Sequence, residues 1–286
     1  MTGLALTLVL SAAFIHASWN FLAKRAGGGA AFVWLFAFLS TIIYLPLILT
    51  LLLVQRPHLD AMDVLFIAGS AAFHLGYFLT LQRGYREGDL SLIYPLARGT
   101  GPTLSTTAAI LLFNERPTVL ALIGALLIIT GVFILTGGPQ LLGQSNVRRS
   151  LIFGLITGVL IAGYTLWDKY AVSTLRVPPL LLDYGSTLGR VGMLAPYARR
   201  HWSEVLAEWR SHRFEVIGVA CLNPLSYILV LTALTFTAVS YVAPAREVSV
   251  LIAVILGTGW LKEGHALRRI AAAHLIILGV MGLALN

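Results

Sequence analysis

Charged residues are scarce in this chain of 286 residues. Only 11% of the residues are Asp, Glu, Lys or Arg, whereas 58% are hydrophobic, and soluble domains carry a charge on about 25% of their residues. So few charges cannot cover the surface of a water-soluble protein of this size, and the same composition excludes an intrinsically disordered chain. The composition therefore indicates a polytopic membrane protein.

Cysteine and catalytic motifs are also sparse. The single Cys221 excludes an internal disulfide and a multi-cysteine metal site. The seven histidines are scattered without metal-ligand spacing, and the sequence contains no His-Glu-x-x-His, Gly-x-Ser-x-Gly, P-loop or Gly-x-Gly-x-x-Gly motif. We therefore expect no metal, no cofactor, no catalytic residue and no enzyme activity. The 20 Lys and Arg outnumber the 12 Asp and Glu, but they form no basic stripe interleaved with aromatics, so no nucleic-acid partner is expected.

Long apolar runs are what the chain does contain. Each is near the length of about 20 residues that crosses a bilayer, and Gly, Pro or charge separates them. Ten runs are found, at roughly 3–23, 31–54, 62–82, 90–113, 118–136, 151–173, 180–197, 213–235, 239–261 and 267–285. The first is predicted to be a retained span rather than a cleaved signal peptide, because it lacks a basic leader. The longest connection, about 198–212, is too short for a soluble domain, so function must lie within the helical bundle.

Basic residues are distributed unevenly among the connections. With the connections assigned alternately to two sides, thirteen Lys and Arg lie on one side and three on the other, namely Arg56, Arg116 and Arg176. The positive-inside rule then makes the connections 1-2, 3-4, 5-6, 7-8 and 9-10 cytoplasmic and both termini outward. Four cations fall within the runs, where a charge needs a reason: Arg98, Lys169, Arg190 and Arg246.

The two halves of the chain repeat each other at an offset of 148 residues. Ala97–Thr136 and Ala245–Ala284 share ten identities in 40 positions without a gap. The offset also matches distinctive residues: Arg98 with Arg246, Glu115 with Glu263, Trp19 with Trp167, and Asn20 with Asp168. Because five is an odd number, two five-helix repeats must cross the membrane in opposite directions, and the basic connections change place between the halves accordingly.

This pattern predicts an all-α integral membrane protein of ten transmembrane helices. Residues 1–140 would form the first five-helix repeat, 141–150 a linker, and 151–286 the second, inverted repeat. Inverted repeats around a central cavity are the architecture of alternating-access transporters, whose substrate site lies near the midplane between the repeats.

The two matched arginines are the first candidates for that site. Arg98 lies about 12 Å into its span at 1.5 Å per residue, between Pro95 and Pro102. Prolines and glycines here predict a break in the helix that frees backbone groups to face a cavity. We expect Arg98 or Arg246 to bind a substrate carboxylate or to act in gating. The alternative is that each snorkels to the headgroups or forms a structural pair.

Polar residues one turn from aromatics are the second group of candidates. His74 with Phe78 and Asn223 with Tyr227 are spaced to share a helix face, and His74, Asn223 and Asp168 would serve the amino end of a substrate. The alternative is that these residues pack helices, pair structurally or anchor the chain at the interface. The predicted substrate-binding set is His74, Tyr77, Phe78, Tyr94, Arg98, Tyr164, Trp167, Asp168, Asn223, Tyr227 and Arg246, and the predicted gating or secondary set is His16, Trp19, Asn20 and Glu247.

These features together resemble a known family. The chain contains ten short runs in two halves, the Trp-plus-polar pairs, the paired Glu115 and Glu263, and a closing Leu-Ile-Ile-x-Gly-Val in each half. In these features it resembles the ten-helix EamA branch of the drug/metabolite transporter superfamily. The chain is most similar to its bacterial inner-membrane exporters of amino acids, including aromatic ones. The resemblance implies a cavity lined by spans 1, 3, 4, 6, 8 and 9. Span 1 lacks the carboxylate on which the four-helix multidrug branch depends, and relatives are usually drawn with cytoplasmic termini, whereas the charges here place the termini outward.

The expected function is therefore that of a multi-pass bacterial inner-membrane carrier. It would export amino acids, aromatic or bulky neutral ones, and related metabolites by alternating access, in contact with lipid. The sequence does not determine the oligomeric state, although a monomer is favoured. The residues leave open a carrier of nucleotide sugars, organic phosphates or drugs. They also leave open, from a different class, an intramembrane enzyme or a lipid-handling protein.

Overall fold

The computed structural model describes residues 1–26, 29–87, 90–136, 147–252 and 266–285, and the described residues form helices and short connections without a strand. The helices are α1 (Gly3–Arg25), α2 (Ala30–Gln55), α3 (Ala61–Glu87), α4 (Leu90–Leu112), α5 (Val119–Thr136), α6 (Val147–Ser173), α7 (Pro179–Arg200), α8 (Trp202–Phe236), α9 (Val239–Arg246) and α11 (Ala266–Ala284). Each predicted run overlaps one of these helices; the ninth, 239–261, begins with α9, and its residues 253–261 lie outside the described part of the chain. The all-α fold predicted from the sequence is thus confirmed.

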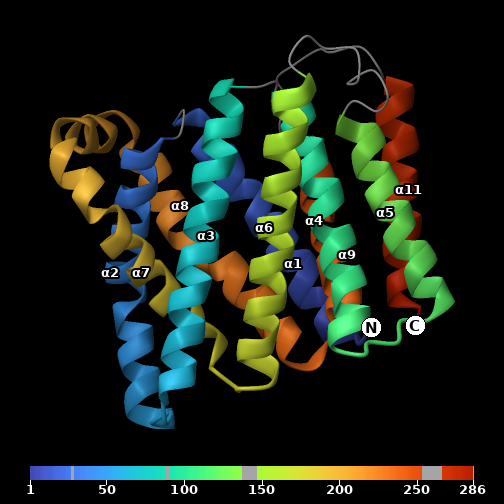
Figure 1. The fold of residues 1–286 in the computed structure, drawn as a ribbon, viewed down its shortest axis with the longest axis horizontal. Helices are drawn as coiled ribbons and strands as arrows, with labels where there is room; N and C mark the ends of the chain where they lie inside the picture. The colour runs from blue at the N-terminus through green and yellow to red at the C-terminus, as the bar shows by residue number, and fades with distance from the viewer. Residues whose placement is uncertain (27–28, 88–89, 137–146, 253–265, 286) are drawn as a thin grey trace.

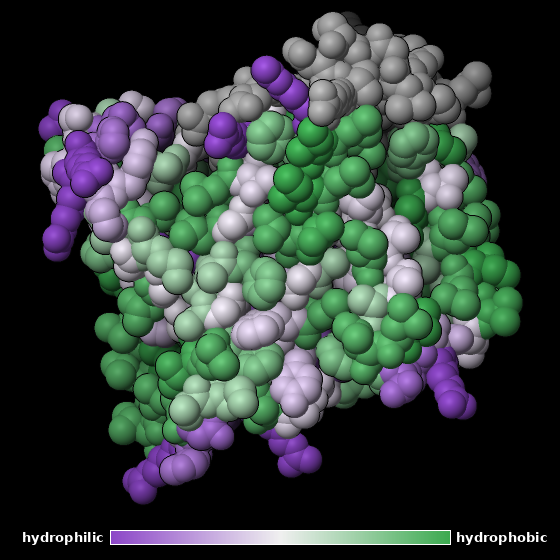
Figure 2. All heavy atoms as spheres, viewed as in Figure 1, coloured by the Kyte–Doolittle hydropathy of each residue, from purple (hydrophilic) through white to green (hydrophobic). Residues whose placement is uncertain are grey.

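The helices stand side by side and their surface is apolar. Five of them contain a segment long and apolar enough to cross a membrane, in α1, α2, α3, α6 and α8, and α5 and α11 contribute shorter apolar helices. Figure 2 shows hydrophobic residues over the middle of the visible face and hydrophilic residues at its two ends. Both termini lie at the same end of the bundle (Figure 1), as an even number of spans requires.

The connection between the seventh and eighth spans is itself helical, which the sequence did not predict. α8 begins at Trp202, and the kink at His212 (φ −131°, ψ 29°) separates its first part from the membrane-spanning part. Val205 in this first part is 1% exposed and packs with Ala31 and Ala198. Burial of this apolar residue against α2 and α7 stabilises a short helix where hydropathy alone indicates only a polar connection.

The two repeats interlock through equivalent contacts. α1 packs against α8 as α6 packs against α3, and α5 packs against α11 (Figure 1). In the last pair a side chain at Gly124 would lie 2.6 Å from the Gly279 carbonyl oxygen, and one at Gly131 would lie 2.9 Å from the Ala272 carbonyl oxygen. The offset of 148 residues relates Gly124 to Ala272 and Gly131 to Gly279, so each of these contacts is the repeat equivalent of the other. The two helices therefore cross on the axis that relates the inverted repeats.

The helix break predicted in span 4 occurs instead in span 9. α4 remains helical through Pro95 and Pro102, whereas α9 ends at Arg246 and Glu247 lies outside the helix before residues 248–252 resume it. Membrane helices tolerate proline where side-chain hydroxyls and neighbouring helices satisfy the freed groups. α6 packs along α4 at this level, where Gly154 and Gly158 lie against Leu96 and Thr100.

Candidate functional site

A cavity lies between the two repeats and is lined by α1, α3, α4, α6, α7, α8, α9 and Ser249. The centre of a water molecule can occupy about 60 Å³ of it, enough for a few waters, since one water needs about 10–15 Å³ by this measure. Eight of the eleven predicted substrate-binding residues line it: His74, Tyr77, Phe78, Arg98, Tyr164, Asn223, Tyr227 and Arg246. His16 and Trp19 of the predicted gating set line it as well.

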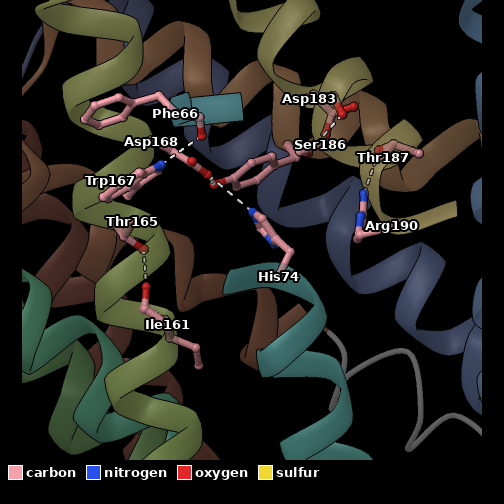
Figure 3. Close-up of polar contacts among 11 residues, drawn as sticks. Phe66, His74, Ile161, Thr165, Trp167, Asp168, Asp183, Ser186, Thr187 and Arg190 are labelled. Atoms are coloured by element: carbon pink, nitrogen blue, oxygen red, sulfur yellow. Dashed lines mark hydrogen bonds and ion pairs between the residues drawn. The ribbon is translucent and has the colours of Figure 1, made fainter. Parts of the chain in front are cut away.

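Asp168 lies behind the cavity wall and holds two of the lining residues. Its Oδ2 is 3.3 Å from His74 Nε2 and accepts a hydrogen bond from the Tyr227 hydroxyl (Figure 3). The residue is fully buried, and its Oδ1 has no hydrogen-bond partner among the described residues. Tyr164 stacks on the His74 ring with centroids 4.3 Å apart. A carboxylate from α6 thereby fixes side chains from α3 and α8 at the cavity.

Arg98 joins the two repeats at the same cavity. Its NH1 lies 3.4 Å from Glu247 Oε1, and its NH2 lies 3.0 Å from His16 Nε2. Only 10% of the Arg98 side chain and 4% of the Glu247 side chain are exposed. The residue equivalent to Glu247 in the first repeat is Gly99, so symmetry offers no matching carboxylate to Arg246.

Arg246 makes a different contact. Its guanidinium carbon lies 5.6 Å from the centroid of the Tyr227 ring, within the range of a cation–π interaction. No Asp or Glu oxygen of the described residues forms an ion pair with it within 4.0 Å. The matched arginines therefore line one cavity but differ in their partners.

α7 contributes two buried charges that the predicted site did not include. Asp183 and Arg190 line the cavity and are 3% and 4% exposed, and Arg190 NH2 donates to the Thr187 hydroxyl at 2.6 Å (Figure 3). Repeat matching could not identify them because their equivalents at the offset of 148 are Leu35 and Ile42. The available signals were the position of Arg190 within an apolar run and the spacing of seven residues, which places the two charges on one face of the helix. Two serines were also missed, Ser226 and Ser249.

Four predicted residues are not among those that line the cavity, and a fifth lies outside the described side chains. Trp167 donates its indole N–H to the Phe66 carbonyl at 2.8 Å and stacks on the Phe66 ring, which directs it toward α3 (Figure 3). The Asn20 amide donates to the His16 carbonyl within its own helix at 2.9 Å. Asp168 and Glu247 contact lining residues from behind the wall, as described above. The Tyr94 side chain is outside the described part of the structure.

The remaining intramembrane cation and the paired glutamate have structural partners. Lys169 Nζ donates to the carbonyls of Leu234 and Thr237 at 2.8 and 3.0 Å, at the end of α8. Glu115 accepts hydrogen bonds from the backbone N–H groups of Val239 and Ser240 at 2.7 and 2.9 Å, at the start of α9. A cation at a helix C-terminus and a carboxylate at an N-terminus both match the helix dipole. Glu263, the repeat partner of Glu115, lies outside the described residues.

Comparison with known proteins identifies both halves of the chain. The profile of the EamA-like transporter family matches residues 3–137 and 148–285. A protein of Archaeoglobus fulgidus described as an uncharacterized transporter is 26% identical over 249 residues, which are 86% of this chain and 84% of that protein. A solved crystal structure has the same fold, with a TM-score of 0.73 at 15% identity over 98% of this chain and 97% of that one. The chain therefore belongs to the EamA-like transporter family and is a multi-pass membrane protein that transports a small molecule.

Proposed function

We propose that the protein exports amino acids across a bacterial inner membrane by alternating access. The observation that carries this proposal is the cavity between the inverted repeats, which combines opposite charges with aromatic rings. An amino acid presents the same combination, an ammonium and a carboxylate on one carbon beside a side chain of variable polarity.

The charges at the cavity balance. Three arginines line it, Arg98, Arg190 and Arg246, together with one aspartate, Asp183. Two further carboxylates, Asp168 and Glu247, contact lining residues from behind. A zwitterion adds no net charge to such a balanced set, whereas a dianion would add two negative charges near Asp183, and like charges in a buried site repel strongly.

Aromatic rings provide the apolar part of the site. Tyr77, Phe78, Tyr164 and Tyr227 line the cavity around His74, and such rings bind an apolar side chain while a few polar groups set its orientation. The small free space means that the cavity has to widen before it admits a bulky amino acid. We therefore place an aromatic or bulky neutral amino acid in an opened form of this cavity.

Unequal conformations of equivalent helices support alternating access. α4 is helical from Leu90 to Leu112, whereas α9 ends at Arg246 and the helix resumes only after Glu247. Gly154 and Gly158 allow the close approach of α4, because a side chain at either would collide with Leu96 or Thr100. Inverted repeats that hold different conformations can exchange them, which moves the access path from one side of the membrane to the other.

A transport assay with the full chain in proteoliposomes tests the proposal. We expect labelled aromatic and bulky neutral amino acids to cross, with outward export inferred from the orientation of the basic connections. Organic phosphates and nucleotide sugars form the comparison arm, because the third arginine at the cavity is the observation that favours a more anionic substrate. Flux of a phosphate compound without flux of any amino acid would contradict the proposal.

A further inference from the structure

α7 gives the cavity one wall that the repeat does not duplicate. Asp183 and Arg190 line the cavity, whereas the lining contains no residue of α2, the helix equivalent to α7. The equivalents of the two charges are Leu35 and Ile42. These charges are therefore not needed to build an inverted-repeat bundle, and their reason has to be sought in what the cavity holds.

Both charges are buried, but they do not form a direct ion pair with each other. Asp183 and Arg190 are 3% and 4% exposed, yet no ion pair within 4.0 Å joins them in the described structure. Arg190 reaches a neutral hydroxyl, that of Thr187 at 2.6 Å, and its buried Nε has no hydrogen-bond partner among the described residues. A buried charge without an ionic partner is costly to the fold, so the pair indicates a ligand that supplies the missing partners.

The other charges at the cavity already have contacts. Arg98 is held by Glu247 and His16, and Arg246 lies over a tyrosine ring. Asp168 accepts from Tyr227 and approaches His74. Among the described carboxylates of the site, Asp183 lines the cavity directly, and it is the natural contact for a positively charged group of the substrate.

The spacing along α7 suits a small zwitterion. Long side chains on a helix point back toward its N-terminus, and the bond from Arg190 to Thr187 places the guanidinium at the level of Thr187. Asp183 is four residues before Thr187, about 6 Å along the axis at 1.5 Å per residue. The ammonium and carboxylate of one α-amino acid can bridge such a gap with a charge-assisted hydrogen bond of about 2.8 Å at each end.

We propose that Asp183 binds the α-ammonium group of the transported amino acid and Arg190 binds its α-carboxylate. This inference rests on the proposed function and deepens it. It moves the carboxylate site from Arg98 or Arg246, where the sequence suggested it, to α7. Because α2 offers no equivalent pair, the substrate binds in one orientation, with its side chain toward the aromatic residues of α3, α6 and α8.

The test measures the full-length protein in proteoliposomes with labelled L-phenylalanine as probe. Two unlabelled competitors are used, 3-phenylpropionate, which lacks the ammonium, and 2-phenylethylamine, which lacks the carboxylate. In Asp183→Asn we expect phenylalanine uptake to fall at least tenfold, and its advantage over 3-phenylpropionate to disappear while its advantage over 2-phenylethylamine persists. In Arg190→Gln the pattern should be reversed. Each advantage is measured as the ratio of the competitor concentration to the phenylalanine concentration that halves uptake of the label. These two ratios do not depend on how much of the variant is folded.

Matched controls separate recognition from general effects of charge removal. Asp63→Asn alters a buried aspartate at the start of α3, and Lys169→Gln alters a half-buried cation of α6 that donates to carbonyls at the end of α8. Neither should change either ratio. If a neutral variant at the site fails to fold, Asp183→Glu and Arg190→Lys keep the charge but change the reach, and the ratios should fall between wild type and one.

The outcomes distinguish this inference from the proposed function. Wild-type uptake of phenylalanine with unchanged ratios in both site variants would overturn the roles of Asp183 and Arg190 and leave amino-acid export standing. A wild-type protein that neither transports nor binds any amino acid would overturn both.

Discussion

The buried pair of Arg98 and Glu247 allows a quantitative prediction about what joins the two repeats. At 3.4 Å and an effective dielectric constant of about 20, two unit charges attract by about 5 kcal/mol, and desolvation of both groups offsets much of this gain. Removal of the Glu247 charge takes away the carboxylate that offsets the desolvation of the buried Arg98 guanidinium. We therefore expect Glu247→Gln to lower the free energy of unfolding by about 3–5 kcal/mol.

A double-mutant cycle separates the two contributions. The variant Arg98→Met/Glu247→Leu removes both charges and keeps similar volumes, so its stability should lie within about 1–2 kcal/mol of wild type. Unfolding would be followed by circular dichroism during titration with sodium dodecyl sulfate in mixed micelles. A double variant as unstable as the sum of the two single variants would refute this reasoning.

The pair of Arg25 and Glu215 provides the matched control. Its atoms lie 3.7 Å apart, but 58% of the Arg25 side chain is exposed. Solvent and salt screen such a pair, and Glu215→Gln should cost less than about 1 kcal/mol. A cost near that of Glu247→Gln would mean that burial does not determine the strength of these pairs.

Three further predictions concern the start of α9, the crossing of α5 with α11, and the side of the membrane on which the termini lie. Glu115→Ala removes the acceptor for two N–H groups at the start of α9 and should lower the free energy of unfolding by about 1–2 kcal/mol; an unchanged thermal unfolding curve would contradict this role. Gly124→Leu should abolish recovery of monodisperse protein because even a Cβ there would lie 2.6 Å from the Gly279 carbonyl oxygen, whereas Gly192→Leu, with nothing within 4 Å, should be tolerated. Tags at both termini should react with a membrane-impermeant label in cells with a permeabilised outer membrane, and protection of both tags would reverse the proposed orientation.

Much of the site could be predicted because its residues are matched between the halves. Arg98 with Arg246, and His74 with Asn223 if one residue of gap is allowed in the offset, stand out from an apolar background, since a charged or polar residue inside a span needs a partner or a ligand. Repeat matching then brought residues far apart in the chain to one predicted cavity. That these residues bind substrate stays a prediction, which the transport assays test.

The same matching failed where the repeats differ. The two charged residues of α7 have apolar equivalents in the first half, so repeat matching did not select them as site residues. Trp167 matches Trp19 in sequence, yet Trp19 lines the cavity and Trp167 turns to the Phe66 carbonyl. The break expected in α4 lies after α9, and α4 instead packs along α6, which approaches it closely at Gly154 and Gly158.

The sequence by itself determined the membrane class, the helices and the inverted duplication, because these depend on hydropathy, charge placement and residue identity along the chain. Only the tertiary structure decided which buried charges meet. His74 contacts a carboxylate 94 residues away, and Arg98 one 149 residues away, so each pairing depends on how the helices rotate and pack. Hydropathy shows that a helix crosses the membrane, but only the packing of neighbouring helices determines which of its faces reaches the cavity.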